Sequence, residues 1–386
     1  MLSLSPAGEV QKNVNGQDCP MLKPRKSIQD LHPYHSPIVS RAGLALDLNE
    51  NAIGCSPRVL ARLQSSSTEE VARYPKREAG EQLVANFLGI EPEQVLLTNG
   101  MDDALAQLFA AYLDVGDELL FADPTFVMYP MLGAASGAKV VRLQSGDDLT
   151  LPVVDFLKRI TPRTRLIAIA NPNNPTGLVA PRTDLLRIVE AAPHAAVLID
   201  EAYFEFCGET LIGDLPSHPN LFVARTFSKA YGLAGLRLGV LTGAPEQIEY
   251  IRRLCPPFNV NSVVLACLEE ALADQSFVQD SVTQARNGCR QIEALCAELN
   301  LHFWPSSANF VLVRLEQKAI PEGSQRPLAA VFVAAMHRRG IEVRDASSNP
   351  GCEGCVRITA GTSEQMPKVL QAIREAAAEA KAGVRQ

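Results

Sequence analysis

Lys229 stands in a short segment whose other side chains are suited to holding an anion. Two hydroxyl side chains, Thr226 and Ser228, precede it, and Arg237 follows after a stretch of small and apolar residues. Lysine is the side chain that forms a Schiff base with an aldehyde, and hydroxyls with a guanidinium group can hold a phosphate. The alternative is a basic, glycine-containing loop packed against a strand, because short motifs also match by chance.

Two segments upstream favour the chemical interpretation. Asn174 follows an apolar run at 166–170, and another apolar run at 196–199 leads directly into Asp200 and Tyr203. The carboxyl ends of parallel strands are where open α/β sheets bind ligands. Taken singly, Asn174 could be a turn asparagine and Asp200 could be a helix cap. Three such strand ends in succession, the third carrying Lys229, predict one site.

The elements around these residues alternate between short β-rich runs and helical stretches, which predicts a mostly parallel sheet covered by helices on both faces. After two prolines the pattern changes to two long helices over 262–300 and then a smaller α/β layer, with strands at 310–313, 341–343 and 356–359, a helix at 328–339 and a final helix after Thr362. The strands of the first sheet are expected at 95–98, 118–121, 139–143, 166–170, 196–199, 221–224 and 238–242.

Composition excludes several classes of protein. With 36 basic and 43 acidic residues, the net charge of −7 provides no electrostatic surface for nucleic acid or an anionic membrane. The apolar runs are strand-length, and the N-terminus lacks an apolar signal core, so a cytoplasmic protein is expected. Nine cysteines, an odd number, predict free thiols. The one CxxC, at 352–355, lacks a second ligand pair, so a surface loop with two free thiols is expected rather than a metal site.

The motifs carry a resemblance to a known family. The chain resembles the fold-type I pyridoxal 5′-phosphate (PLP) aminotransferases and is most similar to the histidinol-phosphate aminotransferase family. The resemblance implies a large domain with a mostly parallel sheet and a smaller C-terminal α/β domain, in keeping with a length of 386 residues. The expected division is a disordered leader at 1–27, an N-terminal arm and small-domain segment at 28–60, the large PLP-binding domain at 61–260 and the small domain at 261–386. The matching motifs are Leu31-His32-Pro33-Tyr34, Leu48-Asn49-Glu50-Asn51, Arg73-Tyr74-Pro75, Asn99-Gly100-Met101-Asp102, Pro124-Thr125-Phe126, the three strand-end segments and Val356-Arg357-Ile358-Thr359.

The resemblance implies a role for each residue around the cofactor ring. Lys229 would hold PLP covalently and, once released, would carry a proton. Asp200 would pair with the ring nitrogen, while Tyr203 and Asn174 would donate hydrogen bonds to the phenolic oxygen. Phe126 matches the aromatic residue that stacks on the ring, although core packing is the commoner fate of a phenylalanine.

The cofactor phosphate has its own expected site. Gly100, Met101 and Asp102 lie between a predicted strand and helix, where backbone N–H groups at a helix N-terminus make an anion site. The hydroxyls of the lysine segment and Arg237 would complete it. The resemblance adds Tyr74 from the neighbouring subunit of a homodimer.

The substrate side depends on the resemblance alone. Arg357 would grip a substrate anion through a forked salt bridge, and Tyr34 and Arg344 would lie near a substrate phosphate. The alternative for Arg344 is a surface residue after a strand. Asn49 and Glu50 are expected to line or close the site from the small-domain side.

The chain departs from the family pattern in three places. Asp103 stands where a glutamate is usual, Ala52 replaces a proline, and the segment 349–355 is an unusual insert between the two arginines. The prediction is a homodimeric aminotransferase that exchanges the amino group of histidinol phosphate with 2-oxoglutarate. An aromatic amino acid aminotransferase of the same family, and a PLP-dependent lyase like the threonine-phosphate decarboxylases, remain alternatives. A binding protein that keeps only the fold would need to have lost the lysine or the aspartate, and both are present.

Overall fold

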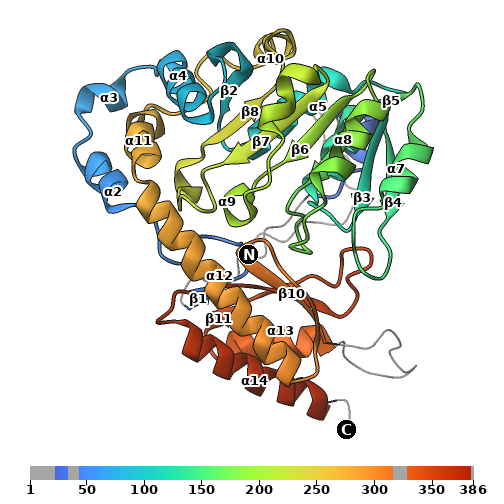
Figure 1. The fold of residues 1–386 in the computed structure, drawn as a ribbon, viewed down its shortest axis with the longest axis vertical. Helices are drawn as coiled ribbons and strands as arrows, with labels where there is room; N and C mark the ends of the chain where they lie inside the picture. The colour runs from blue at the N-terminus through green and yellow to red at the C-terminus, as the bar shows by residue number, and fades with distance from the viewer. Residues whose placement is uncertain (1–21, 34–42, 316–327, 384–386) are drawn as a thin grey trace, which may run out of the picture.

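The computed structural model describes residues 22–33, 43–315 and 328–383. A seven-stranded sheet forms the upper part of the molecule, with the strand order β2-β8-β7-β6-β5-β3-β4 (Figure 1). β8 runs antiparallel to both its neighbours, and the other adjacent pairs are parallel. The predicted strands and the mostly parallel sheet are therefore confirmed. The strands are β2 (Val95–Thr98), β3 (Glu118–Asp123), β4 (Lys139–Gln144), β5 (Thr164–Ala170), β6 (Ala196–Asp200), β7 (Leu221–Thr226) and β8 (Gly239–Thr242).

Helices bury both faces of this sheet. Along β5, Leu166 and Ala168 join one apolar cluster and Ile167 and Ile169 join another, because successive side chains of a strand point to opposite faces. The first cluster includes side chains of α5, α6 and α10, and the second includes those of α7 and α8. These helices are α5 (Met101–Tyr112), α6 (Met128–Ser136), α7 (Val153–Arg159), α8 (Arg182–Ala191) and α10 (Pro245–Arg252).

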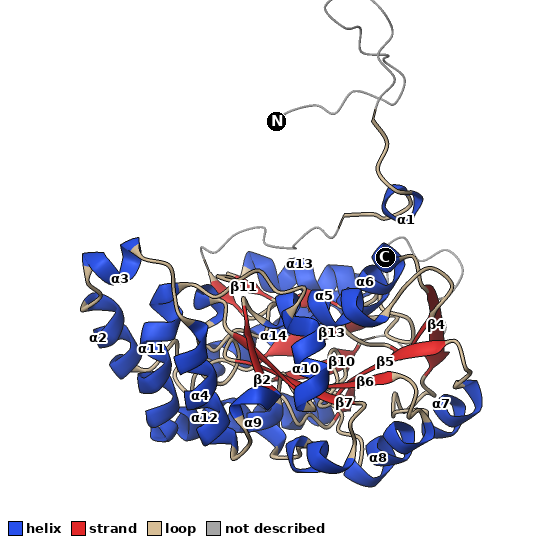
Figure 2. Cartoon of the chain, turned by 90° about the horizontal axis from the view of Figure 1, so that it is seen from above, coloured by secondary structure: helices blue, strands red, loops and turns tan. Residues whose placement is uncertain are grey.

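Another group of helices packs beside the sheet. Seen from above, α2, α4 and α11 gather at one end of the molecule, and α7 and α8 lie toward the opposite end (Figure 2). The remaining elements of the upper part are α2 (Pro57–Gln64), α3 (Thr68–Ala72), α4 (Arg77–Leu88), α9 (Phe204–Cys207), α11 (Ser262–Ala273) and the 3₁₀ turns η1 (Pro92–Gln94), η2 (Ile212–Ser217) and η3 (Ala234–Leu236). The short helix α1 (Lys26–Gln29) contacts α6, where the Ser27 hydroxyl donates to the Ala135 carbonyl.

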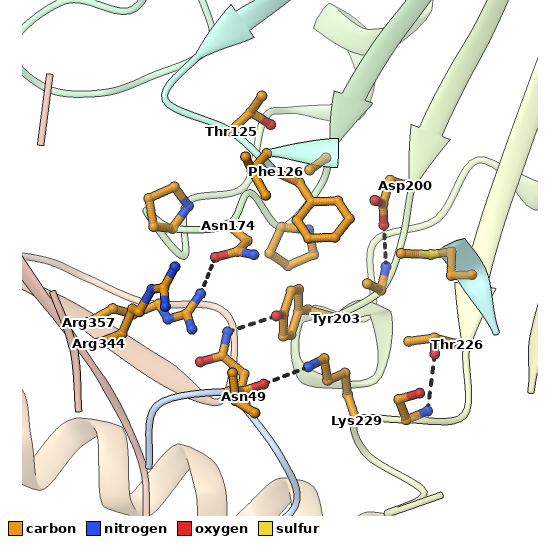
Figure 3. A pocket seen from close by; sticks show the side chains of 18 of the residues that line it. Asn49, Thr125, Phe126, Asn174, Asp200, Tyr203, Thr226, Lys229, Arg344 and Arg357 are labelled. Atoms are coloured by element: carbon orange, nitrogen blue, oxygen red, sulfur yellow. Dashed lines mark hydrogen bonds between the residues drawn. The ribbon is translucent and has the colours of Figure 1, made fainter. Parts of the chain in front are cut away.

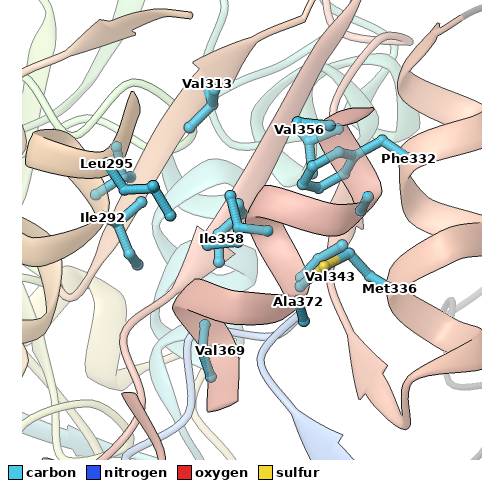
Figure 4. Packing of buried hydrophobic residues seen from close by; sticks show 14 of the residues in the cluster. Ile292, Leu295, Val313, Phe332, Met336, Val343, Val356, Ile358, Val369 and Ala372 are labelled. Atoms are coloured by element: carbon cyan, nitrogen blue, oxygen red, sulfur yellow. The ribbon is translucent and has the colours of Figure 1, made fainter. Parts of the chain in front are cut away.

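A second, antiparallel sheet of order β12-β13-β10-β9 forms the lower part (Figure 1). Its own core packs Ile358 and Val313 of the sheet against Phe332, Val369 and Ile292 of three helices (Figure 4). The elements are β9 (His302–Trp304), β10 (Phe310–Arg314), β12 (Arg344–Asp345), β13 (Cys355–Thr359), α12 (Gln275–Glu298), α13 (Leu328–Arg338) and α14 (Met366–Gly383), and β1 (Leu44–Ala45) pairs in parallel with β11 (Ile341–Glu342) beside them.

Asp274 separates the two long helices that the sequence predicts over 262–300. Its backbone N–H closes the last turn of α11, and its side chain accepts the Phe277 N–H as the N-cap of α12. α12 then contributes Val278 and Val282 to the core beside the large sheet and Leu295 to the core of the small one. α12 thus connects the part of the protein around the large sheet with the part around the second sheet.

No helix of the described residues is long and apolar enough to cross a membrane. The predicted division into leader, arm and two domains stays a prediction, and most of the leader lies outside the described residues.

Candidate active site

A cavity of about 470 Å³ lies between the strand ends of the large sheet and the second sheet (Figure 3). Its lining brings together side chains that are far apart in the sequence. Of the residues that the sequence singled out, those on its wall are Asn49, Glu50, Met101, Asp102, Phe126, Asn174, Asp200, Tyr203, Thr226, Ser228, Lys229, Arg237, Arg344 and Arg357.

The register of the large sheet explains this convergence. Ala170 at the end of β5 is paired with Asp200 at the end of β6, and β7 lies on the other side of β6. Gly239 of the antiparallel β8 is paired with both Thr226 and Thr98. The segment that begins α5 therefore lies next to the segment that carries the lysine.

Asp200 is buried at the end of β6, with 3% of the residue exposed. Its Oδ2 accepts a hydrogen bond from the Tyr129 hydroxyl at 2.6 Å, and its Oδ1 accepts the Ala202 N–H at 3.0 Å. Burial raises the pKa of Asp200 to about 6, and these two hydrogen bonds act in the opposite direction. The carboxylate is held in one orientation, and a cation beside it would favour its charged form.

Lys229 projects into the cavity from the loop after β7. Its Nζ donates to the Leu48 carbonyl at 3.0 Å and lies 5.8 Å from the centroid of the Tyr203 ring. Burial lowers the pKa of Lys229 to about 8, and the positive charge of Arg357 adds to the effect. The neutral amine, which is the nucleophilic and basic form, is therefore accessible near neutral pH.

Tyr203 and Asn174 connect the strand ends to the segments near the second sheet. The Tyr203 hydroxyl accepts a hydrogen bond from Asn49 Nδ2 at 2.8 Å, and Asn174 Oδ1 accepts one from Arg357 Nη1 at 2.6 Å (Figure 3). Burial raises the pKa of Tyr203, so its hydroxyl keeps its proton.

The N-terminus of α5 lies beside Arg237. Gly100, its N-cap, has a φ of 79°, which glycine adopts without strain. A Cβ at this position would lie 2.4 Å from Arg237 Nη2, so the glycine makes room for the guanidinium group. Arg237 forms an ion pair with Asp102 at 3.0 Å. Thr226 and Ser228 place hydroxyls on the same wall, and backbone N–H groups at a helix N-terminus attract anions.

The sequence matches the family model described as aminotransferase class I and II over residues 42–373. The chain belongs to the class I and II aminotransferase family. It is 37% identical over 342 residues to histidinol-phosphate aminotransferase 2 of Pseudomonas fluorescens, with 86% of this chain and 88% of the relative covered. It is 35% identical over 334 residues to histidinol-phosphate aminotransferase 1 of Bacillus cereus, with 85% and 87% covered. A similar solved structure is the histidinol-phosphate aminotransferase of Sinorhizobium meliloti in complex with pyridoxal-5′-phosphate, at a TM-score of 0.82, 25% identity, and coverage of 92% of this chain and 97% of that one.

The two arginines predicted on the substrate side lie opposite each other in this aminotransferase. Arg344 of β12 is the register partner of Arg357 of β13, and both line the cavity. Arg357 Nη2 also donates to the Asp47 carbonyl, which fixes its guanidinium group against the segment before Asn49. Two cations on one wall suit a substrate with strong negative charge.

The structure does not bring the two predicted tyrosines, Tyr34 and Tyr74, into the described wall of the cavity. Tyr34 lies outside the described residues. Tyr74 is 79% exposed, stacks on Phe258 with ring centroids 4.4 Å apart, and is absent from the described residues that line the cavity.

The segment with the CxxC corrects one expectation. Cys352 and Cys355 are free thiols, as predicted, but they are buried rather than placed on a surface loop, because they pack with Trp304 and Leu312. Asn349 of the same segment lines the cavity. The described residues contain no group of three or more His, Cys, Asp or Glu side chains that could hold a metal ion.

Sequence reasoning did not assign a role to two residues that contact the predicted site. Tyr129 donates to Asp200, and Thr359 hydrogen-bonds to Asn49. Tyr129 lies in the first turn of α6, shortly after Phe126, and Thr359 ends a quoted family motif. In the sequence, both hydroxyl residues stand close to predicted site residues. Their hydrogen-bond partners, however, come from distant segments that the sequence does not connect to them.

Proposed function

We propose that this chain is a PLP-dependent aminotransferase that transfers the amino group between histidinol phosphate and 2-oxoglutarate. The observation that carries the proposal is the convergence of Lys229, Asp200 and Tyr203 on one cavity whose wall also carries Arg237. The names of the relatives at 37% and 35% identity support the substrate.

The residues of the cavity fit PLP at its ring nitrogen. Asp200 is buried, and in the part of the chain that the structure describes its partners are two hydrogen-bond donors rather than a cation. Its burial disfavours the charged form and raises its pKa to about 6. A protonated pyridine nitrogen is a cation of the required kind, and pairing with it would stabilise the carboxylate.

The residues also fit the cofactor phosphate. The N-terminus of α5, the hydroxyls of Thr226 and Ser228, and Arg237 offer several donors and one positive charge. The Arg237 guanidinium group occupies the space beside Gly100 that a Cβ would fill. In the proposal, Arg237 exchanges its contact with Asp102 for the phosphate.

Bound PLP supplies an electron sink for the bonds at the substrate Cα. Lys229 would hold the cofactor through its Nζ and, once released, would carry a proton at that nitrogen, for which a pKa of about 8 is well suited. Asp200 would pair with the ring nitrogen, Tyr203 and Asn174 would donate to the phenolic oxygen, and Phe126 would pack against the ring.

Arg357 and Arg344 are proposed to recognise the substrate. Their pairing across β12 and β13 on the cavity wall supports this role, because two neighbouring guanidinium groups suit a substrate carboxylate or phosphate. Asn49, Glu50 and Tyr34 keep their predicted place on the substrate side as part of this proposal.

The homodimer belongs to the same proposal. Tyr74 and Phe258 form an exposed aromatic stack, and Val71 and Leu254, a few positions before each of them in the sequence, are exposed apolar side chains. Large exposed apolar groups favour an interface. A subunit partner would cover them and would receive Tyr74 at its own phosphate site. A cytoplasmic enzyme with no nucleic acid or membrane partner completes the proposal.

A half-reaction screen tests the function. Purified protein with PLP is mixed with histidinol phosphate, histidinol, phenylalanine or threonine phosphate, one at a time, and the visible absorbance of the bound cofactor is followed. We expect the band to convert fastest with histidinol phosphate and to return on addition of 2-oxoglutarate. Faster conversion by phenylalanine would assign the aromatic amino acid activity instead, and carbon dioxide release from threonine phosphate would assign the lyase.

A further inference from the structure

Asn49 lies at the centre of a buried set of hydrogen bonds between the part of the protein around the large sheet and the part around the second sheet. The residue is 1% exposed and has a φ of 55°, a left-handed conformation that asparagine tolerates. Its carbonyl accepts a hydrogen bond from Asn309 Nδ2 at 3.1 Å. The backbone of Asn49 is therefore held in place although it belongs to no helix or strand.

Thr359 determines which way round the Asn49 amide lies. The Thr359 hydroxyl accepts the Asn49 backbone N–H at 3.2 Å and donates its own proton to Asn49 Oδ1 at 3.0 Å. Since Oδ1 is the acceptor toward Thr359, the other end of the amide is the NH₂ group. That Nδ2 faces the Tyr203 hydroxyl at 2.8 Å.

The direction of the Tyr203 proton follows from this arrangement. An amide NH₂ group can only donate, so the Tyr203 oxygen accepts from Asn49 and its own proton must point elsewhere. Within the described residues no other group forms a hydrogen bond with this hydroxyl. Because Tyr203 is buried and lines the cavity, that proton can reach an acceptor only inside the cavity.

We propose that Thr359 and Asn49 are positioning residues that hold the Tyr203 hydroxyl as a hydrogen-bond donor to the phenolic oxygen of the cofactor. The proposal depends on the proposed function for the identity of that cofactor. Thr359 orients Asn49, and Asn49 orients Tyr203. The three residues thus form a chain of hydrogen bonds, the relay, that sets the direction of the Tyr203 proton. Without the relay, the Tyr203 proton could turn toward Asn49 and present a lone pair to the cofactor oxygen.

The relay has a spectroscopic consequence. A donor to an ionised oxygen stabilises the ionised form, and such a charge-assisted bond corresponds to about 1 to 2 pH units in the titration of the acceptor. Loss of the donor therefore moves the titration of the bound cofactor to higher pH. Arg357 and Asp200 also act on Tyr203, and Lys229 Nζ lies 5.8 Å from its ring, but uncharged substitutions in the relay leave these groups in place.

The test uses the holoenzyme and the pH at which the visible band of bound PLP changes. Thr359→Val removes the hydroxyl at nearly constant volume, and Thr359→Ser keeps it. Asn49→Gly removes the amide while preserving a residue that adopts positive φ without strain. Thr242→Val is the matched control, because Thr242 is equally buried and its hydroxyl donates to the Val223 carbonyl at 3.0 Å away from the cavity.

We expect Thr359→Val to raise the midpoint by about 1 pH unit or more and to lower kcat with little change in KM. Thr359→Ser should restore the wild-type midpoint, and Thr242→Val should leave it unchanged. In the Asn49→Gly background, Thr359→Val should add no further shift, because the relay is already broken.

Two outcomes would overturn the relay by itself. One is a Thr359→Val holoenzyme that titrates like the wild type. The other is a Thr359→Val shift that persists at full size in the Asn49→Gly background. A wild-type protein that binds no PLP would instead refute the proposed function, and the relay with it.

Discussion

Replacing Tyr129 by phenylalanine removes one hydroxyl from the most buried part of the site. Tyr129 has no exposed surface, and its ring packs edge-on to Phe121 and Phe126, so phenylalanine should keep the packing. The loss is the 2.6 Å hydrogen bond to Asp200 Oδ2. Hydrogen bonds to charged groups contribute about 1.5 to 3 kcal/mol, which corresponds to about 1 to 2 pH units in the titration of the acceptor.

The sign of the effect follows from Asp200. Its pKa is already raised to about 6 by burial, and loss of a donor raises it further. Burial of the charged carboxylate lowers the free energy of unfolding at pH values above the folded-state pKa. This loss of stability disappears as the pH falls toward the ordinary pKa of 3.8. The apo variant should therefore be less stable than apo wild type at pH 8, and this difference should shrink in acid. PLP should bind about 10- to 150-fold more weakly at neutral pH, because the carboxylate is a poorer partner for a cation.

The assay measures the PLP dissociation constant by absorbance and the unfolding free energy of the apoprotein at pH 8 and pH 5. Tyr112→Phe is the control, because the Tyr112 hydroxyl donates to Gln247 Oε1 at 2.5 Å and neither residue is among the described residues that line the cavity. In an Asp200→Asn background the effect of Tyr129→Phe should fall to that of a neutral hydrogen bond, about 0.5 to 1.5 kcal/mol. An undiminished effect in that background, or an equal loss of PLP affinity in Tyr112→Phe, would refute the reasoning.

Three further predictions concern the proposed roles. Lys229→Ala should abolish turnover and the borohydride-stable attachment of PLP, and peptide mapping that finds the cofactor on another lysine would contradict the assignment. Mixing inactive Lys229→Ala chains with inactive Tyr74→Phe chains should restore activity in hybrid dimers, whereas a fully active monomer in sedimentation at assay concentration would exclude a shared site. Arg344→Ala should reduce kcat/KM for histidinol phosphate about 10- to 150-fold and affect histidinol much less. Equal losses of kcat/KM for both substrates would show that Arg344 does not recognise the phosphate.

Much of the large sheet could be predicted from sequence because its strands are short apolar runs between turn residues. Parallel strands covered on both faces are apolar throughout, and this pattern is local. The runs that end at Ala170 and Asp200 are of this kind, and the structure confirms both as neighbouring strands. The two-residue strands β1 and β12 were not predicted as separate elements, because a pairing of two residues leaves no periodicity in the sequence.

The burial of Cys352 and Cys355 shows the limit of local reasoning. Glycine and proline around them are typical of a surface turn. Their burial depends on Trp304, which reaches them from another strand of the small sheet.

The residue types and their spacing were enough to identify the side chains that could do the chemistry: a lysine that follows two hydroxyl residues, an aspartate at a strand end, and a glycine that begins a helix. The pKa values and orientations of these groups depend instead on contacts that form when the chain folds. The hydroxyl of Tyr129 reaches Asp200 from a helix, and the Thr359 hydroxyl donates to Asn49, 310 positions earlier in the chain. The physical reason is that residue type is a local property, whereas a pKa or the direction of a proton depends on burial and on hydrogen-bond partners that folding brings together.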